Sequence, residues 1–333
     1  MNPQEAAQVK PKVFVSSRIP QPGLDILERE CQVKVNPHDR FLTREELMEE
    51  VKEADGLLCL LPDTIDKEIM SVNTNLKIIS DYAVGYNNID IEEATRRGIM
   101  VTNTPGVLTD TTADLTWALI MSIARRIVES DKFTREGKFK RWTPMLFLGS
   151  DVHHSTLGII GLGRIGRTVA KRAGGFEMRV LYTDVKKAPK EMEDELRVEF
   201  VSLDELLSSS DFVTLHAPLI PETHHLIGEK ELKMMKKTAY LINAARGPLV
   251  DEKALVHALR EKWIAGAALD VYENEPALAP GLSELDNVVV VPHIGSASRA
   301  TREKMAIMAA TNLIAGLKGE VPPNLVNKEV IGK

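Results

Sequence analysis

The sequence predicts an α/β fold with two domains, each built on a parallel sheet. Short apolar runs of strand-forming residues alternate with helical segments along the chain, which is typical of parallel strands joined by crossover helices. The chain has 333 residues, more than one ordinary core accommodates. Its apolar fraction of 44% is enough to fill two cores.

The first part of the chain contains four predicted strands, at 12–15, 56–60, 77–80 and 100–102. Helical segments separate them. One helix begins at Thr43, because Glu46 three residues later completes a capping box that satisfies free N–H groups. Another, 91–97, ends at Gly98, which is a suitable C-cap. This alternation predicts the first parallel sheet.

A Thr-Pro-Gly sequence at 104–106 then interrupts the alternation. The helix that follows is apolar nearly all round over 115–123, so we expect it to be buried on every side, between the domains or against a partner subunit. The segment 132–149 is polar, with Trp142 and a short apolar group set into it. We predict that this segment is an arm or a long loop.

A second series of strands is predicted at 157–160, 179–182, 212–215, 239–243, 266–269 and 288–291, and a long helix at 299–317 ends the pattern. The tail is expected to return to the first domain. The predicted division is therefore a discontinuous domain, 1–105 plus 298–333, and a continuous domain, 106–297.

The composition argues against several classes of protein. The 42 Lys and Arg residues against 48 Asp and Glu give a net charge of −6 without a basic stripe, so no nucleic-acid partner is expected. The N-terminus is polar, and the longest apolar stretch, 117–124, is too short to span a bilayer. Two cysteines form neither a disulfide framework nor a zinc site. We expect a cytoplasmic protein without a membrane association.

A glycine loop, Gly161-Leu162-Gly163-Arg164-Ile165-Gly166, lies between a predicted buried strand and a helix. In this context the first glycine allows a tight turn, the second lets the backbone approach a pyrophosphate, and the third lets helix pack on strand. The helix N-terminus then presents N–H groups to the phosphates. The loop predicts that 106–297 is a dinucleotide-binding, Rossmann-like domain.

Asp184 follows the next strand, where an acid can bind the hydroxyl groups of the adenosine ribose. Its charge would repel a 2′-phosphate, which favours NAD(H) over NADP(H). Lys186 and Lys187 come close behind and could attract such a phosphate. NADP(H) therefore stays possible.

Three groups after the late strands suit the reduction of a 2-oxo acid. Arg246 can hold a carboxylate bidentately, although an arginine at a strand end is as often a surface ion-pair partner. His293 suits proton donation, although a lone histidine is more often structural. Asp270, Glu273 and Glu275 are three carboxylates, one of which could pair with the imidazole and keep it protonated. Their spacing does not choose among them.

The remaining histidine pairs, 153–154 and 224–225, lack a carboxylate or cysteine at ligand spacing. Solvated loops are expected there, and no metal site is predicted.

Several long motifs resemble the D-2-hydroxyacid dehydrogenase family, and within it the glyoxylate/hydroxypyruvate reductases. The resemblance covers nearly the whole chain, with matching segments at 55–61, 84–90, 104–110, 158–166, around Arg246 and Glu275, and at 292–296. It implies two Rossmann-like or flavodoxin-like domains, with the active site in the cleft between them. It also implies that 1–105 plus 298–333 is the substrate-binding domain and 106–297 the NAD-binding domain.

The resemblance assigns roles to individual residues. Arg246 looks like the substrate-binding arginine and His293 like the acid/base, and it is the resemblance that selects Glu275 as the partner of His293. Asp270 resembles the residue that holds the nicotinamide carboxamide, and Trp142 a tryptophan that enters the partner subunit's active site, which implies a homodimer. The other cofactor contacts implied are Thr112, Gly161, Gly163, Arg164, Ile165, Gly166, Asp184, His216, Pro218, Thr223, Ala244 and Gly295, and the other substrate contacts Leu60, Val84 and Gly85.

The implied activity is NAD(P)H-dependent reduction of glyoxylate, hydroxypyruvate or another small 2-oxo acid to the D-2-hydroxy acid. One position departs from the pattern: relatives that use NADPH carry a small residue and an arginine where this chain has Asp184 and Val185. The cofactor preference can therefore differ while the substrate class carries over.

Four other functions are found in proteins of the same fold and are alternatives to the reduction of a 2-oxo acid. Formate dehydrogenases pair their histidine with glutamine rather than with a glutamate such as Glu275, and phosphite dehydrogenases carry a lysine where this chain has Val84. 3-Phosphoglycerate dehydrogenases usually have an added regulatory domain. A co-repressor that senses NADH is the alternative from another class. It keeps the catalytic residues, so an activity assay is needed to separate it from an enzyme.

Overall fold

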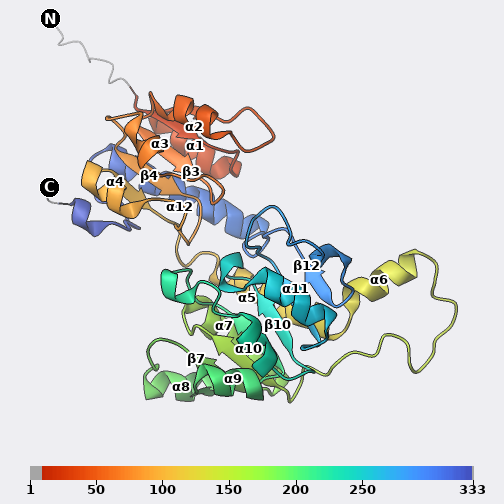
Figure 1. Ribbon diagram of the computed structural model, residues 1–333. Helices are drawn as coiled ribbons and strands as arrows, with labels where there is room; N and C mark the ends of the chain where they lie inside the picture. The colour runs from red at the N-terminus through yellow and green to blue at the C-terminus, as the bar shows by residue number, and fades with distance from the viewer. Residues whose placement is uncertain (1–9, 332–333) are drawn as a thin grey trace, which may run out of the picture. The chain divides into compact units, whose positions relative to one another are not determined.

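The computed structural model describes residues 10–331. The chain divides into two compact units (Figure 1). Unit 1 comprises Met1–Leu108 and Ala297–Lys333, and unit 2 comprises Thr109–Ser296. Within residues 10–331, no helix is both long enough and apolar enough to cross a membrane.

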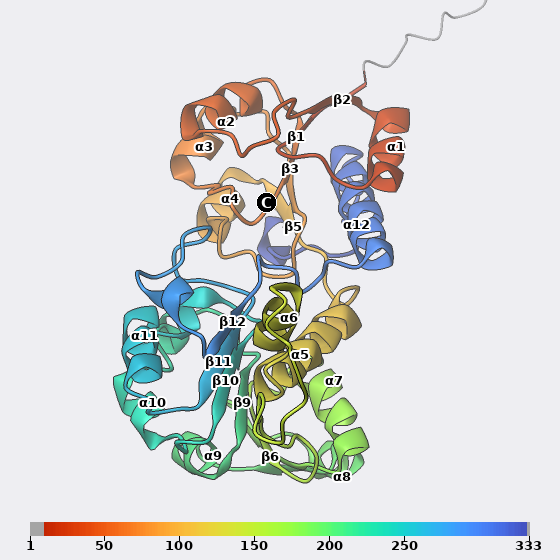
Figure 2. The same cartoon turned by 90° about the vertical axis from the view of Figure 1, so that its right-hand side faces the viewer.

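Unit 1 is built on a five-stranded parallel sheet in the order β2-β1-β3-β4-β5. Its strands are β1 (Lys12–Val15), β2 (Gln32–Val35), β3 (Gly56–Cys59), β4 (Ile78–Asp81) and β5 (Met100–Thr102). Its helices are α1 (Gln21–Glu30), α2 (Arg44–Val51), α3 (Lys67–Ser71), α4 (Ile91–Arg97) and α12 (Arg299–Leu317). Helices α2, α3 and α4 cover one face of the sheet, and α1 and α12 cover the other (Figure 2).

The last long helix, α12, belongs to unit 1 because it packs closely against α1. Gly23 makes that approach possible, since a Cβ there would lie 2.7 Å from the Cβ of Ala306. The capping box predicted at Thr43 and Glu46 is present. The predicted C-cap, Gly98, has a φ of 76°, which favours glycine.

Unit 2 contains a seven-stranded parallel sheet in the order β12-β11-β10-β9-β6-β7-β8. Its strands are β6 (Thr156–Ile160), β7 (Arg179–Thr183), β8 (Val198–Phe200), β9 (Phe212–Leu215), β10 (Tyr240–Asn243), β11 (Gly266–Leu269) and β12 (Val288–Val290). Because β6 pairs with β7 on one side and with β9 on the other, the strand order reverses beside β6. This is the switch point at which doubly wound sheets bind dinucleotides.

Helices cover both faces of the second sheet (Figure 2). The helices are α5 (Thr109–Ala124), α6 (Ile127–Arg135), α7 (Arg164–Ala173), α8 (Lys190–Leu196), α9 (Leu203–Ser209), α10 (Glu229–Met234) and α11 (Glu252–Arg260). Helices α5 and α7 contribute to one core, and α9, α10 and α11 to the other. Short 3-10 turns in the chain are η1 (Gly174–Phe176), η2 (Pro221–Thr223), η3 (Gly247–Leu249), η4 (Leu282–Glu284) and η5 (Lys328–Val330).

Two local features differ from the sequence-based expectations, and a third is not tested by a single chain. Strands β2 and β8 were not predicted, because each lies at a sheet edge and its residues are largely exposed. In the single chain Ala118 of α5 is exposed and Leu115 is half-buried, so the burial of these positions against a partner subunit stays a prediction. The segment predicted as an arm begins inside α6, which continues to Arg135 before the irregular stretch that carries Trp142.

Candidate active site in unit 2

The glycine loop leaves the C-terminal end of β6 and enters α7. Gly161 has a φ of 95°, and a Cβ there would lie 2.7 Å from the backbone nitrogen of Ala217. A Cβ on Gly166 would overlap the carbonyl oxygen of Gly161. These two glycines are therefore required by the turn and by the contact between helix and strand.

Gly163 has a different environment. It is the N-cap of α7, and a Cβ built on it would meet no atom of residues 10–331 within 4 Å apart from its chain neighbours. The backbone there borders open space at the positive end of a helix, in front of Arg164 and Ile165. A pyrophosphate could approach such a position closely, so this cradle fits a dinucleotide.

Asp184 follows β7 directly and is held against the glycine loop. Its Oδ2 accepts a hydrogen bond of 2.8 Å from the backbone N–H of Leu162, and its Oδ1 accepts one of 2.7 Å from Val185. The carboxylate is half-buried beside the cofactor loop. The Nζ of Lys187, whose charge could attract a 2′-phosphate, lies 3.6 Å from the Oε2 of Glu193. This ion pair partly neutralises that positive charge. This arrangement fits NAD(H).

His293 and Glu275 meet beyond the C-terminal ends of β12 and β11. The Nδ1 of His293 lies 2.8 Å from the Oε2 of Glu275, so a protonated Nδ1 donates to the carboxylate. The Oε1 of Glu275 accepts a 3.0 Å hydrogen bond from the backbone N–H of Tyr272. Burial opposes ionisation of Glu275, but these hydrogen bonds and the charge of His293 lower its pKa below the usual value. The pair can hold the imidazole in one orientation.

Asp270 fixes the loop that carries His293. Its carboxylate accepts hydrogen bonds from the backbone N–H groups of Ile294, at 2.6 Å, and Gly295, at 2.8 Å. The backbone N–H of His293 donates to the carbonyl oxygen of Asp270 at 2.9 Å. Burial raises the pKa of Asp270 to about 6, although the backbone donors and His293 oppose that rise. Thr112 lies at the same place, 3.5 Å from a Cβ built on Gly295.

Arg246 lies in the loop between β10 and η3. Asn243 shapes this loop by donating to the carbonyl oxygen of Arg246 at 2.8 Å and accepting from the N–H of Ala245 at 3.1 Å. Arg246 is half-buried, and its charge helps to lower the pKa of Glu275. Ala244 precedes the arginine and is buried. Arg246, Glu275 and His293 thus follow three neighbouring parallel strands, β10, β11 and β12.

The loop after β9 contains three further predicted cofactor contacts. His216 directly follows the strand, and its Nε2 lies 3.0 Å from the hydroxyl of Thr214. Burial lowers the pKa of His216 to about 3, so its ring is neutral at ordinary pH. The hydroxyl of Thr223 donates to the carbonyl oxygen of Pro218 at 2.7 Å, which closes the loop on itself. This loop is adjacent to Gly161 through Ala217.

The predicted residues outside this group lie elsewhere in the chain. In unit 1, Leu60 follows β3 and Val84 and Gly85 follow β4, all at the carboxyl ends of strands. Trp142 lies in the segment after α6 and is 76% exposed. The roles of these four residues stay predictions.

The structure also corrects the sequence-based view of the histidine pairs. His225 has a carboxylate partner, since its Nε2 lies 2.8 Å from the Oε1 of Glu273. His154 lies 3.2 Å from Glu177. Neither contact was foreseen, because both glutamates are distant in sequence from the histidines that they contact. Sequence analysis likewise missed the contributions of Asn243 and Tyr272.

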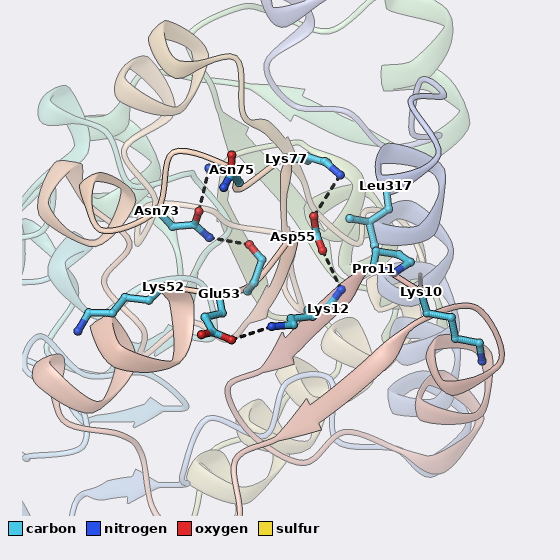
Figure 3. Close-up of a pocket in the computed structure, with 11 residues that line it drawn as sticks. Lys10, Pro11, Lys12, Lys52, Glu53, Asp55, Asn73, Asn75, Lys77 and Leu317 are labelled. Atoms are coloured by element: carbon cyan, nitrogen blue, oxygen red, sulfur yellow. Dashed lines mark hydrogen bonds and ion pairs between the residues drawn. The ribbon is translucent and has the colours of Figure 1, made fainter. Parts of the chain in front are cut away.

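A recess of about 610 Å³ in unit 1 lies at the amino-terminal ends of its strands, opposite the carboxyl ends that Leu60, Val84 and Gly85 follow (Figure 3). It is lined by residues that precede or begin β1, β3 and β4, among them Lys12, Asp55 and Lys77. Lys12 and Lys77 both bind the carboxylate of Asp55 there, through a backbone N–H at 2.8 Å and a side chain at 3.1 Å. Doubly wound sheets bind ligands at the carboxyl ends of their strands, so this recess is not the candidate active site.

Comparisons with known proteins agree with this geometry. Residues 117–295 match the model of the D-isomer specific 2-hydroxyacid dehydrogenase NAD-binding domain. A glyoxylate reductase from Thermococcus gammatolerans is 54% identical over 97% of this chain and 98% of its own. A solved structure from Thermus thermophilus is 49% identical, covers 95% of this chain and 99% of its own, and has a TM-score of 0.89.

A second solved structure bears on the cofactor. It is an NADPH-dependent glyoxylate/hydroxypyruvate reductase from Sinorhizobium meliloti in complex with NADP and malonate, with 28% identity, a TM-score of 0.85 and coverage of 96% of this chain and 98% of its own. The family and the fold class predicted from the sequence are confirmed, and NAD(H) as the favoured cofactor, with NADP(H) possible, is compatible with these matches. The chain therefore belongs to the D-isomer specific 2-hydroxyacid dehydrogenase family, as an oxidoreductase whose residues 117–295 match the family's NAD-binding domain.

Proposed function

We propose that this protein reduces glyoxylate and similar small 2-oxo acids, including hydroxypyruvate, to D-2-hydroxy acids with NADH. The observation that carries the proposal is the 2.8 Å contact between His293 and Glu275 next to Arg246. This site combines a cation for a carboxylate with a proton donor for the adjacent carbonyl. The relatives named glyoxylate reductase support the same substrate class.

The proposal assigns a role to each residue around the reacting groups. Arg246 binds the substrate carboxylate through its planar guanidinium. His293 donates a proton from Nε2 to the carbonyl oxygen, while Glu275 accepts the Nδ1 hydrogen bond and keeps the imidazole oriented. When bound, the nicotinamide supplies the hydride for the carbonyl carbon. Asp270 holds the loop of His293 in place.

The proposed cofactor contacts are centred on the glycine loop. Gly161, Gly163 and Gly166 form the cradle for the pyrophosphate, and Asp184 binds the adenosine ribose. The remaining proposed contacts are Thr112, Arg164, Ile165, His216, Pro218, Thr223, Ala244, Asp270 and Gly295 for the cofactor, and Leu60, Val84 and Gly85 for the substrate. We also propose that the domain division predicted from the sequence separates substrate binding from cofactor binding.

The proposed quaternary state is a homodimer in which Trp142 of one copy reaches the other copy's active site. Trp142 is 76% exposed and Met145, three residues later, is 75% exposed. Large apolar side chains exposed together on one segment mark an interaction surface. A second copy of the chain is the proposed partner, and the cytoplasm is the proposed location, which cell fractionation would test.

Steady-state assays with purified protein test the proposed activity. Glyoxylate, hydroxypyruvate and pyruvate are each supplied with NADH and with NADPH, and oxidation is followed at the nicotinamide absorbance. We expect turnover with at least one of these acids and a higher kcat/KM with NADH. If all three fail while NADH still binds, the NADH-sensing co-repressor is the better description. Turnover of phosphite alone would favour a phosphite dehydrogenase, although Val84 stands where those enzymes carry lysine.

A further inference from the structure

Two adjacent histidines and a glutamate bring three possible metal ligands together in unit 2. His224 and His225 follow η2, and Glu273 lies in the loop after β11. One ligand atom from each of the three side chains lies within 4.8 Å of the other two. The cluster is distinct from the His293–Glu275 pair, since it uses neither of those side chains.

The backbone at His225 is what makes the two rings converge. Neighbouring side chains on an extended chain point to opposite sides. His225 instead has a φ of 51°, in the left-handed region that a residue with a side chain rarely adopts. As a result the two ring centroids lie 4.0 Å apart with 31° between the ring planes. A hydrogen bond of 2.8 Å from the N–H of His225 to the carbonyl oxygen of Pro248 holds this conformation.

Glu273 is oriented toward the histidines by a buried glutamate. Its Oε1 lies 2.8 Å from the Nε2 of His225. Its backbone N–H donates to Glu252 at 2.9 Å, and its Oε2 accepts from the backbone N–H of Glu252 at 3.4 Å. Outer hydrogen bonds of this kind fix the direction of a ligating carboxylate and raise affinity for a metal.

We propose that His224, His225 and Glu273 form a binding site for a divalent transition-metal cation, with Zn²⁺ the best fit. Two imidazole nitrogens and one carboxylate oxygen suit Zn²⁺, whereas Mg²⁺ and Ca²⁺ prefer oxygen ligands alone. Zinc binds such atoms at about 2.0–2.2 Å, so tetrahedral ligands lie roughly 3.3 Å apart. The ligand atoms, which now lie within 4.8 Å of one another, approach that spacing when the ion binds, and water supplies the fourth ligand.

Access and proton balance are both compatible with this site. The side chains of His225 and Glu273 are 35% and 25% exposed, so an ion can enter from solvent. The cation replaces the proton that His225 and Glu273 share. That proton moves to the other ring nitrogen of a neutral histidine, or is released from a charged one.

The pair His153 and His154 provides an internal control. It too has a left-handed residue, His154 with a φ of 59°, and a nearby carboxylate, Glu177 at 3.2 Å. Its rings, however, are 5.1 Å apart at 74°. In the described part of the chain, the only cluster with three converging ligand atoms is the one at His224, His225 and Glu273.

Titration of untagged, chelator-treated full-length protein with Co²⁺ tests the proposal. Cobalt reports nitrogen and oxygen coordination by its visible absorption, and Zn²⁺ should displace it. We expect one saturable site in the wild type. His224→Gln and Glu273→Gln should each weaken binding by roughly tenfold or more. The control His153→Gln should bind the ion as the wild type does.

Two readouts that need no enzymatic activity show whether the variants remain folded: the melting temperature in chelator and the affinity for NADH. Weaker Co²⁺ binding with both readouts retained supports the site. If Glu273→Gln does not fold, His224→Gln is the variant that tests the proposal. His224 takes no part in the His225–Glu273 contact, so its replacement leaves that contact in place. Binding that is unaffected by His224→Gln, or that is lost equally in His153→Gln, overturns the proposal, as does the absence of saturable binding to the wild type.

Discussion

Gly163 offers a test that separates cofactor binding from folding. It is the glycine of the loop whose added Cβ would meet no atom of the described residues within 4 Å apart from its chain neighbours. Its φ of −72° and ψ of −165° are also open to alanine. The substitution Gly163→Ala should therefore leave the protein folded. The new methyl group would occupy the space in which a pyrophosphate approaches the helix N-terminus.

The expected magnitudes follow from these contacts. Alanine at this position makes the unfolded chain less flexible, which raises the free energy of unfolding by about 0.4–1 kcal/mol. Alanine is also a poorer N-cap than glycine, which lowers the free energy of unfolding by a similar amount. The net change in unfolding free energy should be within about 1 kcal/mol. Displacing the phosphate weakens a hydrogen bond to a charged group, about 1.5–3 kcal/mol, which corresponds to roughly 10- to 160-fold in the Kd for NADH.

The assay compares two numbers for each variant: the melting temperature without cofactor and the Kd for NADH from fluorescence titration. Gly174→Ala is the matched control, because it lies at the other end of α7 and its Cβ would also meet nothing within 4 Å. It should bind NADH as the wild type does. Gly166→Ala should instead lower stability by roughly 1–3 kcal/mol, since its Cβ would overlap the carbonyl oxygen of Gly161. Wild-type NADH affinity in Gly163→Ala would refute the proposed cradle.

Three further predictions concern the cofactor preference, the arm and acid stability. Asp184→Asn removes the negative charge but keeps an acceptor for the N–H of Leu162. The ratio of kcat/KM with NADH to kcat/KM with NADPH should therefore fall by about tenfold or more. An unchanged ratio would contradict the role of Asp184. Trp142→Ala should raise the KM for the 2-oxo acid while the Kd for NADH stays constant, and loss of both affinities together would argue against a contact at the partner's active site. The hydrogen bond to Arg40 lowers the pKa of Glu46 from 4.5 to about 2. The ionised Glu46 should therefore stabilise the fold fully above pH 4.5, and this stabilisation should be lost as the pH falls toward 2. The difference in melting temperature between wild type and Glu46→Gln should shrink over that range.

The cofactor loop was predictable because its determinants are local. The turn, the helix N-terminus and Asp184 lie within one strand–helix–strand segment, so spacing alone suggests their arrangement. The capping box at Thr43 was predictable for the same reason, since its two residues are three apart. Edge strands such as β8 were not, because one side of an edge strand has no neighbour and its exposed residues carry no apolar pattern.

The contacts between distant loops could not be derived from spacing. Glu273 and Glu275 are two residues apart, yet Glu275 contacts His293 and Glu273 contacts His225. Which carboxylate faces which histidine depends on the path of the loop after β11. Only the family resemblance selected Glu275, and nothing in the sequence paired Glu273 with a histidine 48 positions away.

The central claim is that His293 is the proton donor of the reaction. Its φ of 52° makes asparagine a suitable replacement, because asparagine tolerates the left-handed region and cannot serve as the acid. For His293→Asn with NADH and a 2-oxo acid that the wild type turns over, we predict a fall in kcat of about 10²–10⁴. The Kd for NADH should stay within about twofold of the wild type. A loss of kcat below about tenfold, or an equal loss of NADH affinity, would contradict the assignment.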